Sequence, residues 1–174
     1  WENSFAVNVM QSLNLIQNAI DYGIDKILIT GTYAEYGEAG LRYSQIPPNA
    51  PLEPVGAYAS SKASLFAASH GLAIEKNIKL KYLRIFSTYG EGQYEGNLWP
   101  SLHKAAMNGE DYHMTGAEQI RDFISVEQVA ELLVNDISFN EVESGKPKIK
   151  NIGTGISQTL KEFSEFWWKK WGAT

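Results

Sequence analysis

The chain contains no cysteine, so disulfides, thiolate metal sites and thiol nucleophiles are all excluded. It has no apolar run approaching the roughly 18 residues that a membrane-spanning helix needs. Its net charge is −5 and its lysines are scattered, so it lacks the basic footprint of a nucleic-acid-binding protein. We therefore expect no nucleic-acid partner and no membrane association. The absence of cysteine is compatible with a cytoplasmic protein, and that is the location we expect.

Histidines are few, and their positions show no spacing typical of metal ligands, so we expect no metal site; they are His70, His103 and His113. The opening residues, Trp1-Glu2-Asn3-Ser4, lack the charged start and the apolar core of a signal peptide. The sequence begins without methionine and enters a helical pattern almost at once. We therefore expect these 174 residues to be a piece of a longer protein.

What the sequence does contain is an alternation of helical and strand-like patterns. Apolar residues recur at helical spacing over residues 5–20, and a second helical pattern covers residues 58–76. Short apolar runs at 26–30 and 80–86 predict buried parallel strands, and a further strand is predicted at 148–152. Capping boxes at Ser125 with Gln128 and at Thr159 with Glu162 predict two more helix starts. This alternation predicts an α/β fold with a mostly parallel, doubly wound sheet.

One pair of residues suggests chemistry. Tyr58 and Lys62 are four residues apart on a predicted helix, which places them on one helical face. A nearby ammonium lowers the pKa of a tyrosine, and such a tyrosine can exchange a proton with an alcohol or a carbonyl. The same spacing also fits an ordinary surface pair, and it recurs at Tyr22 and Lys26, where Gly23 breaks the helix. The local pattern by itself favours neither alternative.

Several motifs, in order along almost the whole chain, resemble the extended short-chain dehydrogenase/reductases, in particular the NAD-dependent epimerase/dehydratase family that acts on nucleotide sugars. These motifs are Asn8-Val9 with Leu13-Asn14-Leu15, Ile29-Thr30-Gly31-Thr32 with Tyr36-Gly37, Tyr58 to Lys62, Leu83-Arg84-Ile85-Phe86-Ser87-Thr88-Tyr89-Gly90, Asn97-Leu98 with Pro100, Gln119-Ile120-Arg121-Asp122-Phe123 and Asn151-Ile152-Gly153-Thr154-Gly155. The resemblance implies a Rossmann-like sheet. Residues 1–90 would be the second half of the NAD(P)-binding domain and carry the catalytic residues. Residues 91–174 would be mainly a substrate-binding region, with the strand at 148–152 returning to the main sheet.

The resemblance also implies catalytic roles. Tyr58 would be the general acid/base at a sugar hydroxyl or ketone, and Lys62 would lower its pKa. Thr32 would hydrogen-bond the same sugar oxygen. Tyr58 and Lys62 would also hold NAD or NADP, together with Asn8 and Phe86. Asn8 could instead be an ordinary amide on a helix surface.

Substrate contacts are implied at Thr32 and at four positions of the later chain, Ser87, Asn97, Leu98 and Arg121. Arg121 would clamp the diphosphate of a nucleotide sugar, which suits a planar and permanently charged group. It could instead form an ion pair with nearby Asp122 or Glu118. Glu35 is expected to be a solvated loop carboxylate.

The chain departs from the family pattern in two places, and the first of them narrows the range of reactions that we expect. Family dehydratases place an Asp-Glu pair directly after the threonine aligned with Thr32, whereas this chain has Tyr33 and Ala34. Because Ala34 cannot move a proton, 4,6-dehydration is disfavoured. The GxxGxxG phosphate turn is also missing, and in the family it would precede Trp1.

The sequence therefore predicts an NAD(P)-dependent nucleotide-sugar 4-epimerase or 4-ketoreductase and does not separate the two. The alternatives are a non-catalytic nucleotide-binding scaffold on the same fold and, less favoured, a 4,6-dehydratase. By resemblance, a homodimer could form through the helix over residues 5–22 and the helix that starts near Tyr58.

Overall fold

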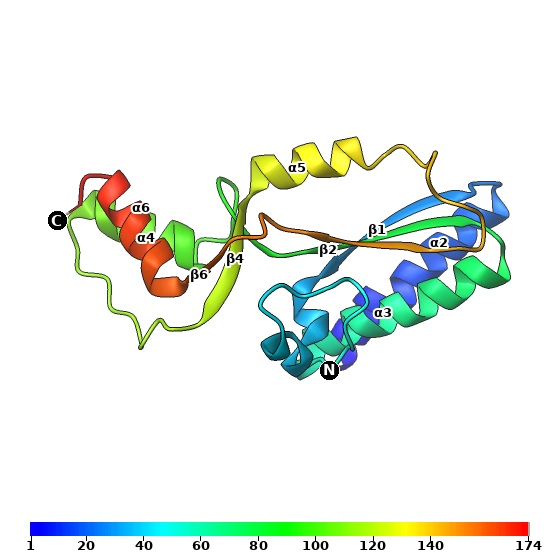
Figure 1. The fold of residues 1–174 in the computed structure, drawn as a ribbon, viewed down its shortest axis with the longest axis horizontal. Helices are drawn as coiled ribbons and strands as arrows, with labels where there is room; N and C mark the ends of the chain where they lie inside the picture. Colours follow the sequence, from blue (N-terminus) through cyan, green and yellow to red (C-terminus); the bar gives the residue numbers. More distant parts are fainter. Residues whose placement is uncertain (174) are drawn as a thin grey trace. The chain divides into compact units, whose positions relative to one another are not determined.

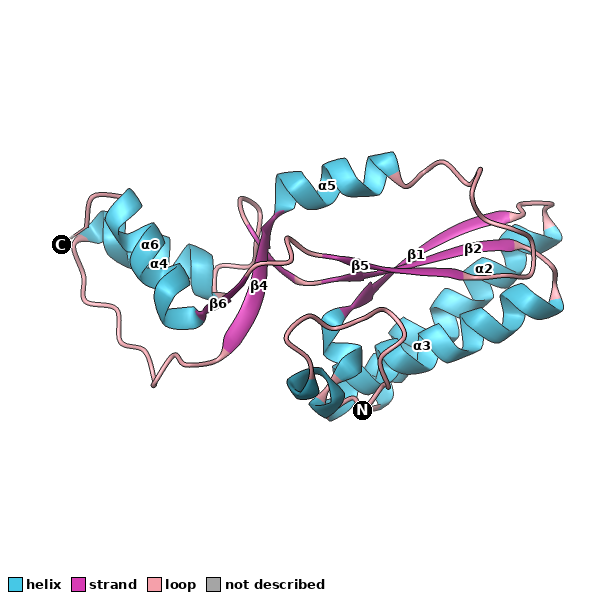
Figure 2. Cartoon of the chain, viewed as in Figure 1, coloured by secondary structure: helices cyan, strands magenta, loops and turns pink. Residues whose placement is uncertain are grey.

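The computed structural model describes residues 1–173, and it divides the chain into two compact units. The first unit comprises Trp1–Ile85 with Val134–Ile152, and the second comprises Phe86–Leu133 with Gly153–Thr174. Figure 1 labels most of the elements, and Figure 2 distinguishes helices from strands. The α-helices are α1 Glu2–Phe5, α2 Ser12–Asp21, α3 Gly56–Glu75, α4 Leu98–Asn108, α5 Val126–Asn135 and α6 Leu160–Lys170. The strands are β1 Lys26–Thr32, β2 Lys79–Ile85, β3 Ser87–Tyr89, β4 Ile120–Ser125, β5 Lys148–Ile152 and β6 Ser157–Thr159.

The first unit is built on a parallel three-stranded sheet with the order β1-β2-β5. Helices α2 and α3 lie on one face of it (Figure 1). The connections between successive strands of this sheet contain helices, α3 between β1 and β2 and α4 and α5 between β2 and β5. Parallel strands need such long crossover connections. The predicted α/β class with a parallel sheet is therefore confirmed.

The core of this unit forms where α2 and α3 meet the sheet. Ala73 of α3, Ile78 and Leu80 are almost fully buried and form the centre of the cluster. Ile20 of α2 and the β1 side chains Ile27 and Ile29 pack against it. The helical and strand periodicities of the sequence place the members on α2, α3, β1 and β2 on facing surfaces, and Ile78 joins them from the connection between α3 and β2.

Strand β1 is less buried than its apolar sequence suggested. Residues 26–30 are exposed or half-buried, and only the last two residues, Gly31 and Thr32, are buried. The reason is that β1 lies at the end of the strand order in the described chain. Strand β2 is central and is buried over residues 80–84, as predicted.

The first helical pattern forms a less regular helix than predicted. A π-helical segment, Ala6–Gln11, lies between α1 and α2 and contains Asn8. Such widened turns occur often at functional sites. The segment predicted as loop after β1 also contains helical turns of the 3₁₀ type, at Tyr33–Tyr36 and Glu38–Arg42.

The second unit contains a smaller mixed sheet with the order β3-β4-β6. Strand β3 runs parallel to β4, and β6 runs antiparallel to it. Helix α6 begins at the predicted capping box, in which the Thr159 hydroxyl accepts from the Glu162 amide. Aromatic rings from β3, α4, α6 and the residue that follows α6 pack together here, and they belong to Tyr89, Trp99, Phe163, Trp167 and Trp171.

Across residues 1–173, every helix is too short or too polar to cross a membrane. In the same residues, histidine, aspartate and glutamate side chains form no group of three or more that could hold a metal ion.

Candidate active site

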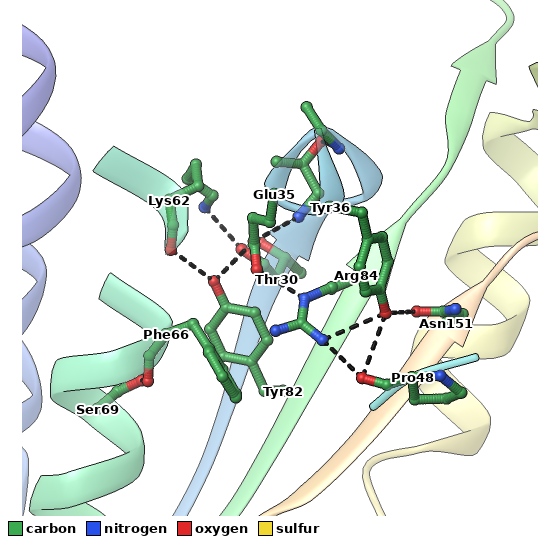
Figure 3. A network of polar contacts seen from close by, with 12 residues as sticks. Thr30, Glu35, Tyr36, Pro48, Lys62, Phe66, Ser69, Tyr82, Arg84 and Asn151 are labelled. Carbon is green, nitrogen blue, oxygen red and sulfur yellow. Dashed lines mark hydrogen bonds and ion pairs between the residues drawn. The ribbon is translucent and has the colours of Figure 1, made fainter. Parts of the chain in front are cut away.

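The helix α3 carries both Tyr58 and Lys62 near its N-terminal end, and it contacts β1 and the 3₁₀ turn that follows β1. The Tyr58 side chain is exposed, at 56% of its surface. Lys62 is half-buried, and its ammonium donates a hydrogen bond of 2.7 Å to the Thr30 carbonyl (Figure 3). Burial lowers the pKa of Lys62, and the negative charge of Glu35 partly opposes this effect. The lysine thus ties the helix to the carboxyl end of β1, two residues before Thr32.

Asn8 is linked to the same helix from the π-helical segment. Its side-chain amide donates a hydrogen bond of 2.9 Å to the Ser61 hydroxyl. Ser61 is fully buried and donates in turn to the Tyr58 carbonyl, at 2.8 Å. Asn8 is therefore a half-buried anchor rather than a surface amide. The 5–22 segment and the helix bearing Tyr58 are held together by polar contacts at this point.

Thr32 is the last residue of β1, and its side chain is buried. Its hydroxyl accepts a hydrogen bond from the Ala34 amide at 3.3 Å and caps the short 3₁₀ turn. Its own amide donates to the Glu35 carboxylate at 2.9 Å. The end of the strand is therefore fixed by two local bonds, and the threonine hydroxyl keeps a proton that it can donate.

Glu35 is where the sequence-based expectation was wrong. It is not a solvated loop carboxylate, since it has 0% exposure and pairs with the Arg84 guanidinium at 2.7 Å. It also accepts from the Tyr82 hydroxyl at 2.9 Å. The sequence carried a signal for Arg84 alone, because an arginine inside a buried strand requires a buried acceptor, and this signal did not identify Glu35 as the acceptor.

Arg84 extends this network toward the loop before α3 (Figure 3). Its Nη1 atom donates to the Tyr36 hydroxyl and to the Pro48 carbonyl, at 3.2 and 3.0 Å. The Tyr36 hydroxyl donates onward to Asn151 of β5 at 2.7 Å. The guanidinium also lies over the Phe66 ring of α3, 4.3 Å from its centroid. The paired charges are thus held by hydrogen bonds and flanked by aromatic rings.

Gly31 makes room for this arrangement. A Cβ atom at this position would lie well inside van der Waals contact of the Tyr82 ring and of the Glu35 carboxylate. Any side chain at residue 31 would therefore push the tyrosine or the glutamate away from the end of β1.

The remaining candidates belong to the second unit. Phe86 packs beside Gly153, and Ser87 begins β3, opposite Phe123 of β4. Arg121 is a half-buried residue of β4, and its Nη1 donates to the Ile120 carbonyl.

The Asp122 carboxylate is occupied by a neighbouring turn. It accepts from the Thr154 amide and hydroxyl and from the Gly155 amide, at 2.7–2.9 Å. Asp122 therefore has a structural role of its own in fixing the turn that follows β5.

Asn97 and Leu98 lie together at the start of α4. Asn97 is the exposed residue before the first turn, and its carbonyl accepts from the amide and hydroxyl of Ser101. Leu98 is the first helical residue and is half-buried. The structure thus groups Asn8, Thr32, Tyr58 and Lys62 around α3 in the first unit. The other candidates, Phe86, Ser87, Asn97, Leu98 and Arg121, lie in the second unit.

Comparison with known proteins identifies the family. The model of the NAD dependent epimerase/dehydratase family matches residues 2–153, which is most of the chain. The chain belongs to this family. Its members are described as NAD dependent, which agrees with the predicted cofactor class and leaves NAD and NADP undistinguished.

Curated relatives with similar sequences include UDP-glucose 4-epimerases. That of Corynebacterium glutamicum is 27% identical over 91% of this chain and 51% of its own length. The Agl12 protein of low-salt glycan biosynthesis in Haloferax volcanii is 26% identical over 92% of this chain and 50% of its own length. This chain therefore spans about half the length of the curated relatives it matches.

Solved structures show the same fold. A dTDP-glucose 4,6-dehydratase of Bacillus anthracis in complex with NAD superposes with a TM-score of 0.86 and 23% identity, over 98% of this chain and 53% of that one. A UDP-glucose 4-epimerase of Thermotoga maritima with UDP-glucose gives 0.81 and 23%, over 95% and 53%. At these identities the likeness concerns the fold, and it includes both epimerases and dehydratases.

Proposed function

We propose that the protein containing this chain is a nucleotide-sugar 4-epimerase or 4-ketoreductase that transfers a hydride to or from a sugar ring carbon. The observation that carries the proposal is the anchoring of Lys62 on the Thr30 carbonyl. This bond holds the helix bearing Tyr58 against the strand end bearing Thr32. This connection between the two elements supports a shared role for Tyr58 and Thr32 at one sugar oxygen.

In this proposal each residue has a separate task. The exposed phenol of Tyr58 exchanges the proton of the sugar hydroxyl, and the Thr32 hydroxyl orients the same oxygen. The Lys62 ammonium has three donors, and the Thr30 carbonyl takes one of them. The others suit the hydroxyls of a ribose, which supports the binding of a nicotinamide nucleotide by Lys62 beside Tyr58. Roles for Asn8 and Phe86 in cofactor binding are proposed on family grounds. The bound nicotinamide would supply or accept the hydride.

Substrate binding in the second unit is part of the same proposal. Arg121 would pair with the diphosphate, because a guanidinium can bind phosphate oxygens in two parallel bonds. Ser87 would bind a sugar hydroxyl. Asn97, with the backbone of Leu98, would bind near the nucleotide base. On family grounds we also propose that the chain divides into a cofactor-binding part and a mainly substrate-binding part. On the same grounds we propose a homodimer that forms through the helices of residues 2–21 and 56–75.

The turn after β1 supports epimerisation or ketoreduction over dehydration. Tyr33 and Ala34 supply no carboxyl group at the positions where family dehydratases have one. Glu35 is the only acid in this turn, and it is buried and paired with Arg84. It is therefore not placed to replace the missing acid.

The test uses the whole protein with the oxidised or the reduced form of NAD or NADP. The panel of nucleotide sugars includes UDP-glucose, dTDP-glucose and a 4-keto nucleotide sugar, which is the substrate that a 4-ketoreductase requires. Conversion that leaves bound cofactor unchanged in amount indicates an epimerase, and stoichiometric consumption of NAD(P)H indicates a reductase. Tyr58→Phe should lower kcat at least about 100-fold, because the proton donor is lost. Tyr22→Phe is the matched control, since Tyr22 has the same spacing from a lysine but is 89% exposed at the end of α2, and it should leave kcat unchanged.

Full turnover by Tyr58→Phe would reject the catalytic assignment. Nucleotide binding without conversion of any sugar on the panel would instead favour the non-catalytic scaffold.

A further inference from the structure

The Tyr82 hydroxyl occupies a position between the two elements that carry the proposed catalytic groups. It lies 2.9 Å from the Glu35 carboxylate and 3.1 Å from the Lys62 carbonyl (Figure 3). The same Glu35 oxygen accepts the Thr32 amide at 2.9 Å. A single chain of short contacts therefore runs from the backbone of Thr32, through Glu35 and Tyr82, to the backbone of Lys62.

The next turn of α3 rests on the same side chains. Phe66, four residues after Lys62, packs edge-on against the Tyr82 ring, with 4.9 Å between the centroids. The Phe66 ring also packs against the Arg84 guanidinium. Tyr82 and the Glu35–Arg84 pair therefore support the position of α3 relative to the end of β1, in addition to the bond from Lys62 to the Thr30 carbonyl.

Tyr82 is suited to act as a permanent donor. Burial, reinforced by the neighbouring Glu35 charge, raises the pKa of Tyr82 well above its ordinary value. The hydroxyl therefore keeps its proton, and both of its neighbours here, a carboxylate and a carbonyl, are acceptors. Removing this hydroxyl would leave both acceptors in a buried site with one donor fewer.

We propose that Tyr82, acting with Glu35, is a positioning residue that holds Thr32 and Lys62 in register for the reaction. This inference rests on the proposed function and adds to it a residue that touches neither substrate nor cofactor. Small displacements of reacting groups are costly, since a shift of about 1 Å can reduce a rate about 100-fold. The loss of a single hydroxyl behind the site should therefore appear mainly in kcat.

The test compares Tyr82→Phe with Tyr36→Phe in the whole protein. Both variants remove one hydroxyl from a fully buried tyrosine of the same network. Tyr36, however, bonds to Arg84, Pro48 and Asn151, and not to Lys62 or the Glu35 carboxylate. For Tyr82→Phe we expect kcat to fall at least about tenfold with KM changed less than about twofold. For Tyr36→Phe we expect a loss of thermal stability with kcat within about twofold of the unmodified protein.

A second readout does not depend on turnover. Hydrogen exchange of the backbone should become several-fold faster at residues 30–32 and 62–66 in Tyr82→Phe and stay unchanged there in Tyr36→Phe. Equal losses of kcat in the two variants, or no loss in Tyr82→Phe, would show that the hydroxyl serves stability alone and would overturn the inference. If the unmodified protein converts no nucleotide sugar, the proposed function fails. The hydrogen-exchange comparison then tests the inference by itself. Faster exchange at residues 30–32 and 62–66 in Tyr82→Phe alone supports it, and equal exchange in the two variants overturns it.

Discussion

Replacing Arg84 by methionine tests how much the buried ion pair contributes to the fold. Arg84 is 1% exposed and donates to Glu35, to Tyr36 and to the Pro48 carbonyl. Methionine keeps most of the volume but removes all three bonds and leaves the Glu35 carboxylate buried without a cation. Removing one partner of a buried pair costs about 3–5 kcal/mol, and we expect this loss for Arg84→Met.

A double-mutant cycle separates the pair from its parts. Glu35→Gln alone strands the guanidinium and should cost a similar amount. The double variant Glu35→Gln with Arg84→Met buries no charge, so its stability should lie within about 2 kcal/mol of the unmodified protein. The coupling free energy between the two positions should then be at least about 4 kcal/mol.

Urea unfolding followed by far-UV circular dichroism at neutral pH measures all four proteins. Lys146→Met provides a control, because Lys146 forms an exposed ion pair with Glu143 at the surface. It should not measurably change the unfolding midpoint. If the double variant instead loses the sum of the two single penalties, the two charges are not energetically coupled and the argument from burial is refuted.

Two further predictions concern the same unit. Burial alone would raise the pKa of Asp136, but bonds from Lys150 and Lys81 outweigh it and hold the pKa below its ordinary value. The stability that Asp136 contributes is therefore present above about pH 4 and is lost as the pH falls through its folded-state pKa. When melting temperature is measured at a series of acidic pH values, it should fall less steeply with decreasing pH for Asp136→Asn than for the unmodified protein. Gly31→Ala should cost about 1–3 kcal/mol by overpacking against Tyr82, whereas Gly71→Ala, in α3 with open space around it, should stabilise by up to about 1 kcal/mol in chemical unfolding. Equal effects of the two glycine replacements would contradict the packing argument.

Periodicity and capping were sufficient for the main elements. The apolar runs at 26–30, 80–86 and 148–152 became β1, β2 and β5, with ends shifted by at most two residues. The capping box at Thr159 starts α6, and the one at Ser125 forms both of its predicted bonds with Gln128. These features depend on local sequence, which is why they could be read without a structure.

Exposure along β1 and the π-helical segment around Asn8 could not be predicted in this way. The burial of β1 depends on which strands flank it, and a sequence pattern does not reveal strand order. The widened helical turn at Ala6–Gln11 has no signature in the spacing of apolar residues.

The sequence by itself determined the fold class, the family and the list of candidate residues, because these follow from local periodicity and from motifs of adjacent residues. Only the tertiary structure decided the environment of Glu35. In the sequence it is a carboxylate in a turn, 49 residues from the arginine that pairs with it. The pairing exists because parallel β1 and β2 lie side by side, with Gly31 opposite Arg84 in their register. Whether a charge is solvated or buried depends on such contacts between distant segments.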